Sequence, residues 1–279
     1  MGDDGRSGPQ LVLGVVSGDA SARASAELLC AELGAAAGAS ISSRLFPSYV
    51  ALTDAAASGA AAIVWAPPLV ALELEARGAA TVVACSRRRS GSTYHAALFT
   101  RRELRLSSLA ELRGRSIGWV SRQSLSGHIV PRAYLIANGV DPDLVCGAQR
   151  FYENHSAVVR AVAGGACDVG ATFANLDPST RAIRDAGWND VGVRVDAFEV
   201  LGVTGAIPAD AMALSTRLPE RVRAAVTGAL IGLPVTARGA LRALLHADAL
   251  ERPTAEWRRA FDALRGLPAR IHASSRPPA

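Results

Sequence analysis

Short apolar segments alternate with helical segments along most of this 279-residue chain. The runs 11–16, 41–46 and 61–65 have the length and apolar content of buried strands. Each is followed by a segment with helical features, and residues 68–77 begin with the proline that the first turn of a helix tolerates. Strands that alternate with helices predict a parallel sheet covered by helices. The chain is therefore predicted to have an α/β fold.

The alternation resumes in the middle of the chain. Residues 94–100 are another strand candidate, and residues 109–120 are typical of a short helix, a glycine turn and a strand. Strands and helices then alternate to about residue 173, and helices follow from about residue 219 to residue 264. A chain of this length can form two compact lobes, because a single core stops growing at roughly 250–300 residues.

We therefore predict two α/β lobes joined by a two-crossover hinge. The chain is expected to leave the first lobe near Thr100 and to return near Gly205. This division gives the following segments: residues 10–99 and 206–279 in lobe 1, residues 100–205 in lobe 2, and residues 1–9 and 272–279 as flexible tails.

Composition limits the class of protein. Hydrophobic residues make up 49% of the chain, and no apolar run reaches the roughly 18–20 residues that a membrane span needs. The net charge is +5, but the arginines are scattered apart from Arg87–Arg89, so no nucleic-acid partner is expected. The four cysteines lie far apart without the spacing of a metal site, and neither a metal nor a cofactor is expected. These features predict a soluble monomer.

The N-terminal segment through Pro9 is polar and acidic. It lacks the basic and apolar regions of a secretory signal. We expect either that the protein stays in the cytoplasm or that an export signal is missing from this chain.

The most informative strand-to-helix turn is Ser121–Pro131, which follows the strand predicted at 116–120. Ligands of open α/β sheets bind where helices begin beyond the carboxyl ends of strands. Ser124 and Ser126 offer hydroxyl donors there, and Gly127 lets the backbone approach a ligand. The same residues could also form an ordinary serine cap followed by a glycine turn, and the residues alone leave both interpretations open.

The segment around this turn resembles a known family. Residues 123–133 (QSLSGHIVPRA) look like the Ser-Thr-Ser-Gly-Tyr-x-x-Pro stretch of the PhnD-like phosphate, phosphite and phosphonate-binding proteins, and residues 108–118 look like its lead-in. Ser124 and Ser126 match the serines of the family. Leu125 replaces its threonine, which removes one side-chain donor. The resemblance implies a type II periplasmic-binding-protein fold and a ligand contact from this turn.

Further similarities follow in the order of the family. Residues 47–49 resemble its ligand-contacting tyrosine loop, which makes Tyr49 a candidate contact. Residues 91–95 resemble its approach to the first crossover, which makes Tyr94 a second candidate. Trp65 opens a stretch that resembles the family's turn after a strand, and this tryptophan either lines the ligand pocket or packs in the core.

Residues 153–171 resemble the family segment that carries a ligand-contacting histidine, and His155 falls on that position. A histidine at a helix N-terminus can donate to an oxyanion, more strongly when it is protonated, although a lone histidine is often a cap or a surface residue. Residues 171–175 lack the acid with which phosphonate binders hold an amine. Asp210 resembles the acid of the return crossover, where it either contacts ligand or orders the hinge.

Together these residues and the resemblance predict a solute-binding protein that closes on a small oxyanion. The resemblance further implies that it serves as the binding component of an ABC importer in the periplasm. The candidate ligand-binding residues are Tyr49, Trp65, Tyr94, Ser124, Leu125, Ser126, Gly127, His155 and Asp210. Two alternatives stay open, a cytoplasmic ligand sensor that acts through a partner and an enzyme that processes a small acid on the same fold. No catalytic residue is predicted, because the candidate site lacks a paired acid and base, a nucleophile set and a metal cluster.

Overall fold

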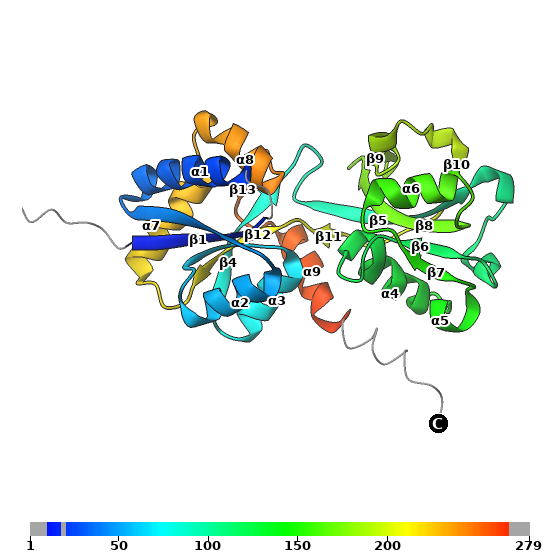
Figure 1. The fold of residues 1–279 in the computed structure, drawn as a ribbon, viewed down its shortest axis with the longest axis horizontal. Coiled ribbons are helices and arrows are strands. Elements are labelled where there is room, and N and C mark those ends of the chain that lie inside the picture. The colour runs from blue at the N-terminus through cyan, green and yellow to red at the C-terminus, as the bar shows by residue number, and fades with distance from the viewer. Residues whose placement is uncertain (1–9, 18–20, 268–279) are drawn as a thin grey trace, which may run out of the picture. The chain divides into compact units, whose positions relative to one another are not determined.

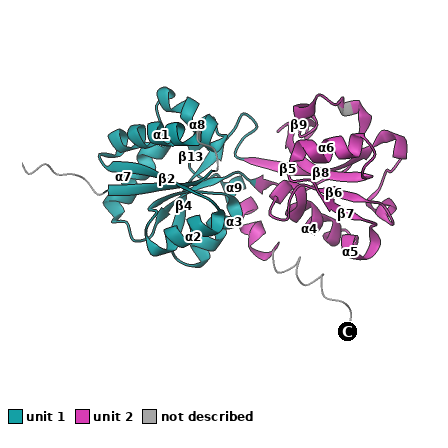
Figure 2. Ribbon diagram, viewed as in Figure 1, with its two compact units in different colours: residues 1–92, 208–258 teal, residues 93–207, 259–279 magenta. Residues whose placement is uncertain are grey.

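A computed structural model describes residues 10–17 and 21–267 of the chain, which forms two compact units (Figure 2). Unit 1 contains residues 1–92 and 208–258, and unit 2 contains residues 93–207 and 259–279. The tails predicted at 1–9 and 272–279 lie outside the described residues. Each unit is an α/β structure with its own sheet.

The boundaries between the units differ from those predicted. The first crossover falls at residues 92–93 rather than near Thr100, because strand β5 (Thr93–Arg101) pairs with strands of unit 2 along its whole length. The return falls at residues 207–208, two residues after the predicted boundary.

The sheet of unit 1 has the strand order β13-β4-β12-β3-β1-β2. Its strands are β1 (Gln10–Val16), β2 (Ser40–Phe46), β3 (Ile63–Ala66), β4 (Ala80–Arg87), β12 (Ala211–Ser215) and β13 (Ala249–Glu251). β1 pairs in parallel with β2 and β3, as the alternation predicts. The prediction of a purely parallel sheet is nevertheless wrong, because β12 lies antiparallel between β3 and β4. When the chain returns to unit 1, β12 begins at Ala211, which pairs with Ala66 at the carboxyl end of β3. β12 therefore runs in the direction opposite to that of β3 and β4.

Helices cover both faces of this sheet. They are α1 (Ser21–Ala37), α2 (Tyr49–Ser58), α3 (Pro68–Ala76), α7 (Glu220–Ile231) and α8 (Arg238–Leu245). Figure 1 shows α1 and α8 on one face and α2 and α3 on the other, and α7 packs against α1. Helix α9 (Ala255–Ala263) spans the boundary of the units, and the chain from residue 259 belongs to unit 2 rather than to lobe 1.

The sheet of unit 2 has the strand order β10-β5-β8-β6-β7, with β9 beside β8 and β11 beside β5. Its strands besides β5 are β6 (Ile117–Trp119), β7 (Gln149–Phe151), β8 (Val169–Leu176), β9 (Ile183–Ala186), β10 (Phe198–Val203) and β11 (Ile207–Pro208). β6 is parallel to β7 and β8, whereas β5 is antiparallel to β8 and β10. The carboxyl ends of β6, β7 and β8 therefore meet at one edge.

Two apolar layers sandwich this second sheet. The helices are α4 (Val130–Ala137), α5 (Pro142–Val145) and α6 (His155–Ala163), and a single wide turn (Leu125–Ile129) leads into α4. Leu98 and Phe99 of β5 are both fully buried and enter opposite layers, since successive side chains of a strand point to opposite faces. The Phe99 ring packs edge-on against Trp188 and Phe198, with centroids 5.4 and 5.0 Å away.

No single helix within residues 10–17 and 21–267 has both the length and the apolar content that a membrane span requires. One bent pair, residues 220–231 with residues 235–245, meets them jointly by length and composition.

Candidate anion-binding site

The turn after β6 of unit 2 is built around Ser124. Its backbone is extended (φ −70°, ψ 120°), and its Oγ accepts a hydrogen bond from the N–H of Gly127 over 3.0 Å. The Ile129 N–H reaches back to the Ser124 carbonyl over 2.9 Å, which closes the wide turn. Ser124 is thus a helix cap, and because its oxygen acts there as an acceptor, its hydroxyl proton remains able to serve an anion.

Gly127 allows this turn to pack closely. A methyl group at this position would lie 2.2 Å from Val120 Cγ2 and 2.8 Å from Ser124 Oγ. The Val120 N–H donates to the Gly127 carbonyl over 3.0 Å. The glycine therefore lets the turn fold onto the end of β6, which is a requirement of the protein's own packing and is separate from any approach to a ligand.

Leu125 and Ser126 begin the helical segment and are almost completely buried, with 8% and 4% of their surface exposed. The N–H groups in the first turn of a helix have no acceptor within the helix. Ser126 adds a hydroxyl to these backbone donors, whereas Leu125 adds only apolar surface.

His155 is the first residue of α6, directly after β7. The side chain of Asn154 caps the helix by accepting from the Ala157 N–H over 2.8 Å. His155 Nδ1 lies 3.0 Å from Thr172 Oγ1 of β8, and its ring is 5.2 Å from that of Phe173. Burial lowers the pKa of His155 to about 4, so the imidazole is neutral at neutral pH. His155, which would donate more strongly when protonated, is therefore a neutral donor at neutral pH.

Backbone hydrogen bonds join the end of β6, which leads into the Ser124 turn, to the turn between β7 and α6. The Tyr152 N–H donates to the Trp119 carbonyl over 2.9 Å, and the Glu153 N–H donates to the Val120 carbonyl over 2.7 Å. Glu153 is exposed and has a positive φ of 70°, which lets the chain turn sharply into α6. The structure therefore brings five of the predicted residues, Ser124 to Gly127 and His155, to one edge of the unit 2 sheet.

A polar network around the buried Arg132 links α4, α5 and β7 beside this edge. Arg132 of α4 donates through both terminal nitrogens to Asp143 of α5, over 3.0 and 2.5 Å. Gln149 of β7 donates to the same carboxylate over 2.8 Å and accepts from Trp119 Nε1 over 2.8 Å. Sequence reasoning missed this network and Thr172, because only the folded chain brings their partners together.

Tyr49 and Asp210 both belong to unit 1. Tyr49 is the half-buried first residue of α2, which Ser48 caps by accepting from the Ala51 N–H over 3.2 Å. Burial, together with the charge of Asp210, raises the pKa of the Tyr49 phenol. The phenol therefore keeps its proton and can donate a hydrogen bond at neutral pH.

Asp210 also takes part in internal contacts of unit 1. Its carboxylate lies 3.7 Å from Arg88, and its backbone carbonyl accepts from the Ser86 N–H over 2.8 Å. Burial raises the pKa of Asp210, whereas Arg88 and His246 oppose this shift. These contacts favour the interpretation in which Asp210 orders the chain near the return crossover.

The remaining two candidates lie in different surroundings. Trp65 of β3 is 8% exposed and packs in the core of unit 1, and its indole nitrogen is buried without a hydrogen-bond partner among the described residues. Tyr94 lies half-buried on β5 of unit 2. Each of the two aromatic side chains thus remains a prediction as a ligand contact.

Two α/β units, each with parallel strands interrupted by an antiparallel strand, define the type II periplasmic-binding-protein class. Polar turns at the parallel strand ends fit this class. The chain belongs to the family described as "ABC transporter, phosphonate, periplasmic substrate-binding protein", whose sequence model matches residues 14–257. The family resemblance predicted from the sequence is thereby confirmed.

Solved structures with the same fold have low sequence identity. XAC2383 from Xanthomonas citri, described as bound to ATP, is 19% identical with a TM-score of 0.76, and the match covers 96% of this chain and 99% of that one. PhnD1 from Prochlorococcus marinus, in complex with methylphosphonate, is 17% identical with a TM-score of 0.65 and coverages of 94% and 98%. The aliphatic sulphonate binding protein SsuA from Escherichia coli is 17% identical with a TM-score of 0.53 and coverages of 98% and 85%. A search of curated proteins gave no match.

Proposed function

We propose that the protein binds a small phosphorus oxyanion such as phosphate, phosphite or a phosphonate, without turnover, as the binding component of an ABC importer. The observation that carries this proposal is the meeting of the Ser124–Gly127 turn with His155 at one edge of the unit 2 sheet. Hydroxyl groups, first-turn N–H groups and a neutral imidazole are all donors, and an oxyanion supplies only acceptors. The family description supports a transport role and a periplasmic location for the protein.

The substituent on phosphorus is proposed to be small and uncharged. Residues 171–175 at the carboxyl end of β8 contain no carboxylate that could hold an amine, and Leu125 adds apolar surface beside Ser126. We therefore expect methylphosphonate to bind more tightly than 2-aminoethylphosphonate. Glu153 in the neighbouring turn is exposed and is not expected to hold the amine. Replacing Glu153 with Gln should therefore leave the preference for methylphosphonate over 2-aminoethylphosphonate unchanged.

The direct test is isothermal titration calorimetry of the full chain with phosphate, phosphite, methylphosphonate, 2-aminoethylphosphonate and sulfate. ATP belongs in the same panel, because the Xanthomonas citri structure is described as bound to it. Saturable binding of one phosphorus oxyanion is expected. The absence of binding for every phosphorus compound would contradict the proposal.

Two variants locate the site. Ser126→Ala and His155→Ala each remove one donor, and each is expected to weaken binding about 10-fold to 100-fold, since a hydrogen bond to a charged group contributes about 1.5–3 kcal/mol. Ser156→Ala, which alters the residue next to His155, is the matched control and should bind like the wild type. Wild-type affinity in both site variants would show that the ligand binds elsewhere.

A further inference from the structure

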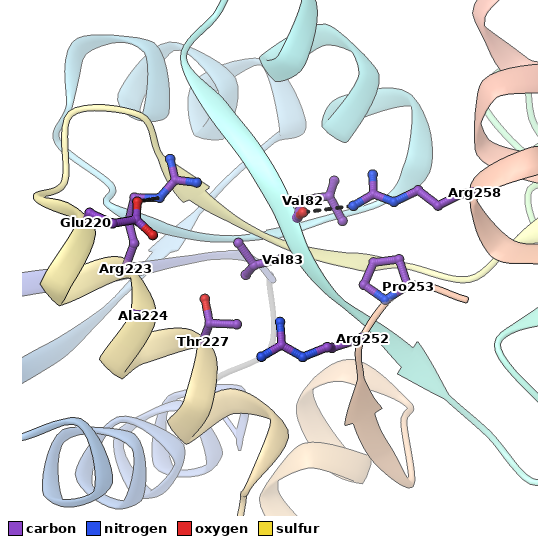
Figure 3. A pocket seen from close by; sticks show the side chains of 9 residues that line it. All are labelled: Val82, Val83, Glu220, Arg223, Ala224, Thr227, Arg252, Pro253 and Arg258. Atoms are coloured by element: carbon purple, nitrogen blue, oxygen red, sulfur yellow. Dashed lines mark hydrogen bonds and ion pairs between the residues drawn. The ribbon is translucent and has the colours of Figure 1, made fainter. Parts of the chain in front are cut away.

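Unit 1 contains a polar pocket whose lining includes none of the nine candidate residues. The pocket has a volume of about 530 Å³ and lies among β4, α7, the segment after β13 and α9 (Figure 3). Three guanidinium groups line it, those of Arg223, Arg252 and Arg258. Glu220 is the one carboxylate among the described lining residues, so positive charge is in excess.

Arg258 is held in place before any ligand arrives. Its Nη2 donates to the Val82 carbonyl over 3.1 Å, its Nη1 lies 4.0 Å from Glu75 Oε1, and its guanidinium sits 5.5 Å from the centre of the Trp257 ring. A side chain that is already ordered loses little conformational freedom when it binds an anion.

A peptide strand does not suit this place, although β4 has an open edge here. β13 pairs only with residues 85–87 of β4. The Val82 N–H donates to Glu75 over 3.4 Å, and the Val82 carbonyl accepts from Arg258. The backbone N–H and carbonyl of Val82 are thus both occupied, so they cannot form the hydrogen bonds that an added strand requires.

Arg223 and Arg252 have unused donor capacity. The Nε of Arg223 is buried and makes no hydrogen bond to a described residue, although Glu220 Oε2 lies 3.6 Å away. Within the described part of the chain, the Arg252 side chain has neither an ion pair nor a hydrogen bond, and Figure 3 shows it extending toward Thr227. Buried donors usually have an acceptor, and the forked donors of arginine match phosphate geometry.

We infer that this pocket binds a phosphorylated organic molecule. Its volume falls in the range of about 300–1,000 Å³ that is typical of small-molecule pockets and exceeds what a single phosphate group fills. Val83 and Pro253 provide apolar surface for the organic part, and the arginines bind the phosphate. The site is separate from the one proposed in unit 2.

The test is calorimetry at low salt with glucose 6-phosphate, pyrophosphate and glucose. The full chain carrying His155→Ala is used, so that the proposed unit 2 site contributes little. Glucose 6-phosphate should bind saturably, pyrophosphate more weakly and glucose not at all. Adding Arg252→Ala should weaken the binding of glucose 6-phosphate at least 10-fold.

Arg221→Ala is the matched control, because Arg221 is exposed on the same helix as Arg223, lies outside the pocket lining and carries the same charge. It should leave the affinity unchanged. Equal losses in Arg252→Ala and Arg221→Ala would mean that only the net charge attracts the ligand, which would overturn the inference. The absence of binding for both phosphate compounds would overturn it as well. Neither result bears on phosphonate binding by the wild-type chain.

Discussion

The Nδ1 atom of His155 lies 3.0 Å from the Oγ1 atom of Thr172. This contact joins the first residue of α6 to β8 and fixes the imidazole at the carboxyl edge of the parallel strands. Thr172 is completely buried and packs so tightly that a methyl group on Gly187 would lie 2.1 Å from its hydroxyl oxygen. The orientation of His155 therefore depends on the packing of β8 as well as on its own helix.

Thr172→Val should weaken oxyanion binding without abolishing it. The substitution keeps the shape of the side chain but removes the hydroxyl that orients the imidazole, and one such hydrogen bond contributes about 0.5–1.5 kcal/mol. We expect a threefold to tenfold rise in the Kd for methylphosphonate by calorimetry, which is a smaller effect than that of His155→Ala. If Thr172→Val has a larger effect than His155→Ala, Thr172 does not act through the histidine.

Acid should destabilise the protein through His155. The pKa is about 4 in the folded protein against the ordinary 6.5, so between these values the unfolded chain binds a proton that the folded chain does not. The stabilisation is fully present above pH 6.5 and is lost as the pH falls toward 4, by an amount on the order of 2 kcal/mol.

Urea unfolding at pH 7.5 and pH 4.5 measures this effect. Carboxyl groups titrate in every variant, so the comparison is with His155→Gln, whose loss of stability on acidification should be smaller than that of the wild type. Identical losses would show that His155 is not buried in the neutral form.

Gly127→Ala should destabilise unit 2. The added methyl group would lie 2.2 Å from Val120, and relieving this clash should cost about 1–3 kcal/mol because the turn or the end of β6 must move. Gly228→Ala is the control, since a methyl group there meets no atom within 4 Å and alanine favours the α7 helix. Thermal unfolding should give a lower Tm for the first variant and an equal or higher Tm for the second.

Asp143→Ala should be among the more destabilising substitutions in the molecule. It leaves the guanidinium of Arg132, whose side chain is only 4% exposed, without its bidentate partner. Asp143 itself is 40% exposed and Asp141 remains 4.0 Å from Arg132, so we expect a loss of about 1.5–3 kcal/mol, the range for a hydrogen bond to a charged group. The exposed pair of Arg194 and Asp196 is the control, and Asp196→Ala should change stability much less, because solvent screens an exposed ion pair. Chemical denaturation measures both, and similar effects would mean that the Arg132 network adds no stability.

The amino-acid sequence alone identified the elements that depend on local patterns. Apolar runs placed the parallel strands of unit 1 at 11–16, 41–46 and 61–65, and the structure has β1, β2 and β3 there. The family resemblance followed from residues that lie close together in the chain, such as those around Ser124. Local patterns are sufficient here because strand and helix periodicity and turn preferences are properties of short segments.

The tertiary structure decided what depends on distant contacts. The antiparallel insertions of β12 and β5 arise from the path of the chain between the units, and no short segment encodes them. The neutral state of His155 follows from burial against residues of β8, whereas the sequence left its protonation state open. The arginine pocket of unit 1 likewise joins β4 to segments more than a hundred residues away. Charge state and pocket shape depend on which groups are excluded from water together, and only the folded chain determines that.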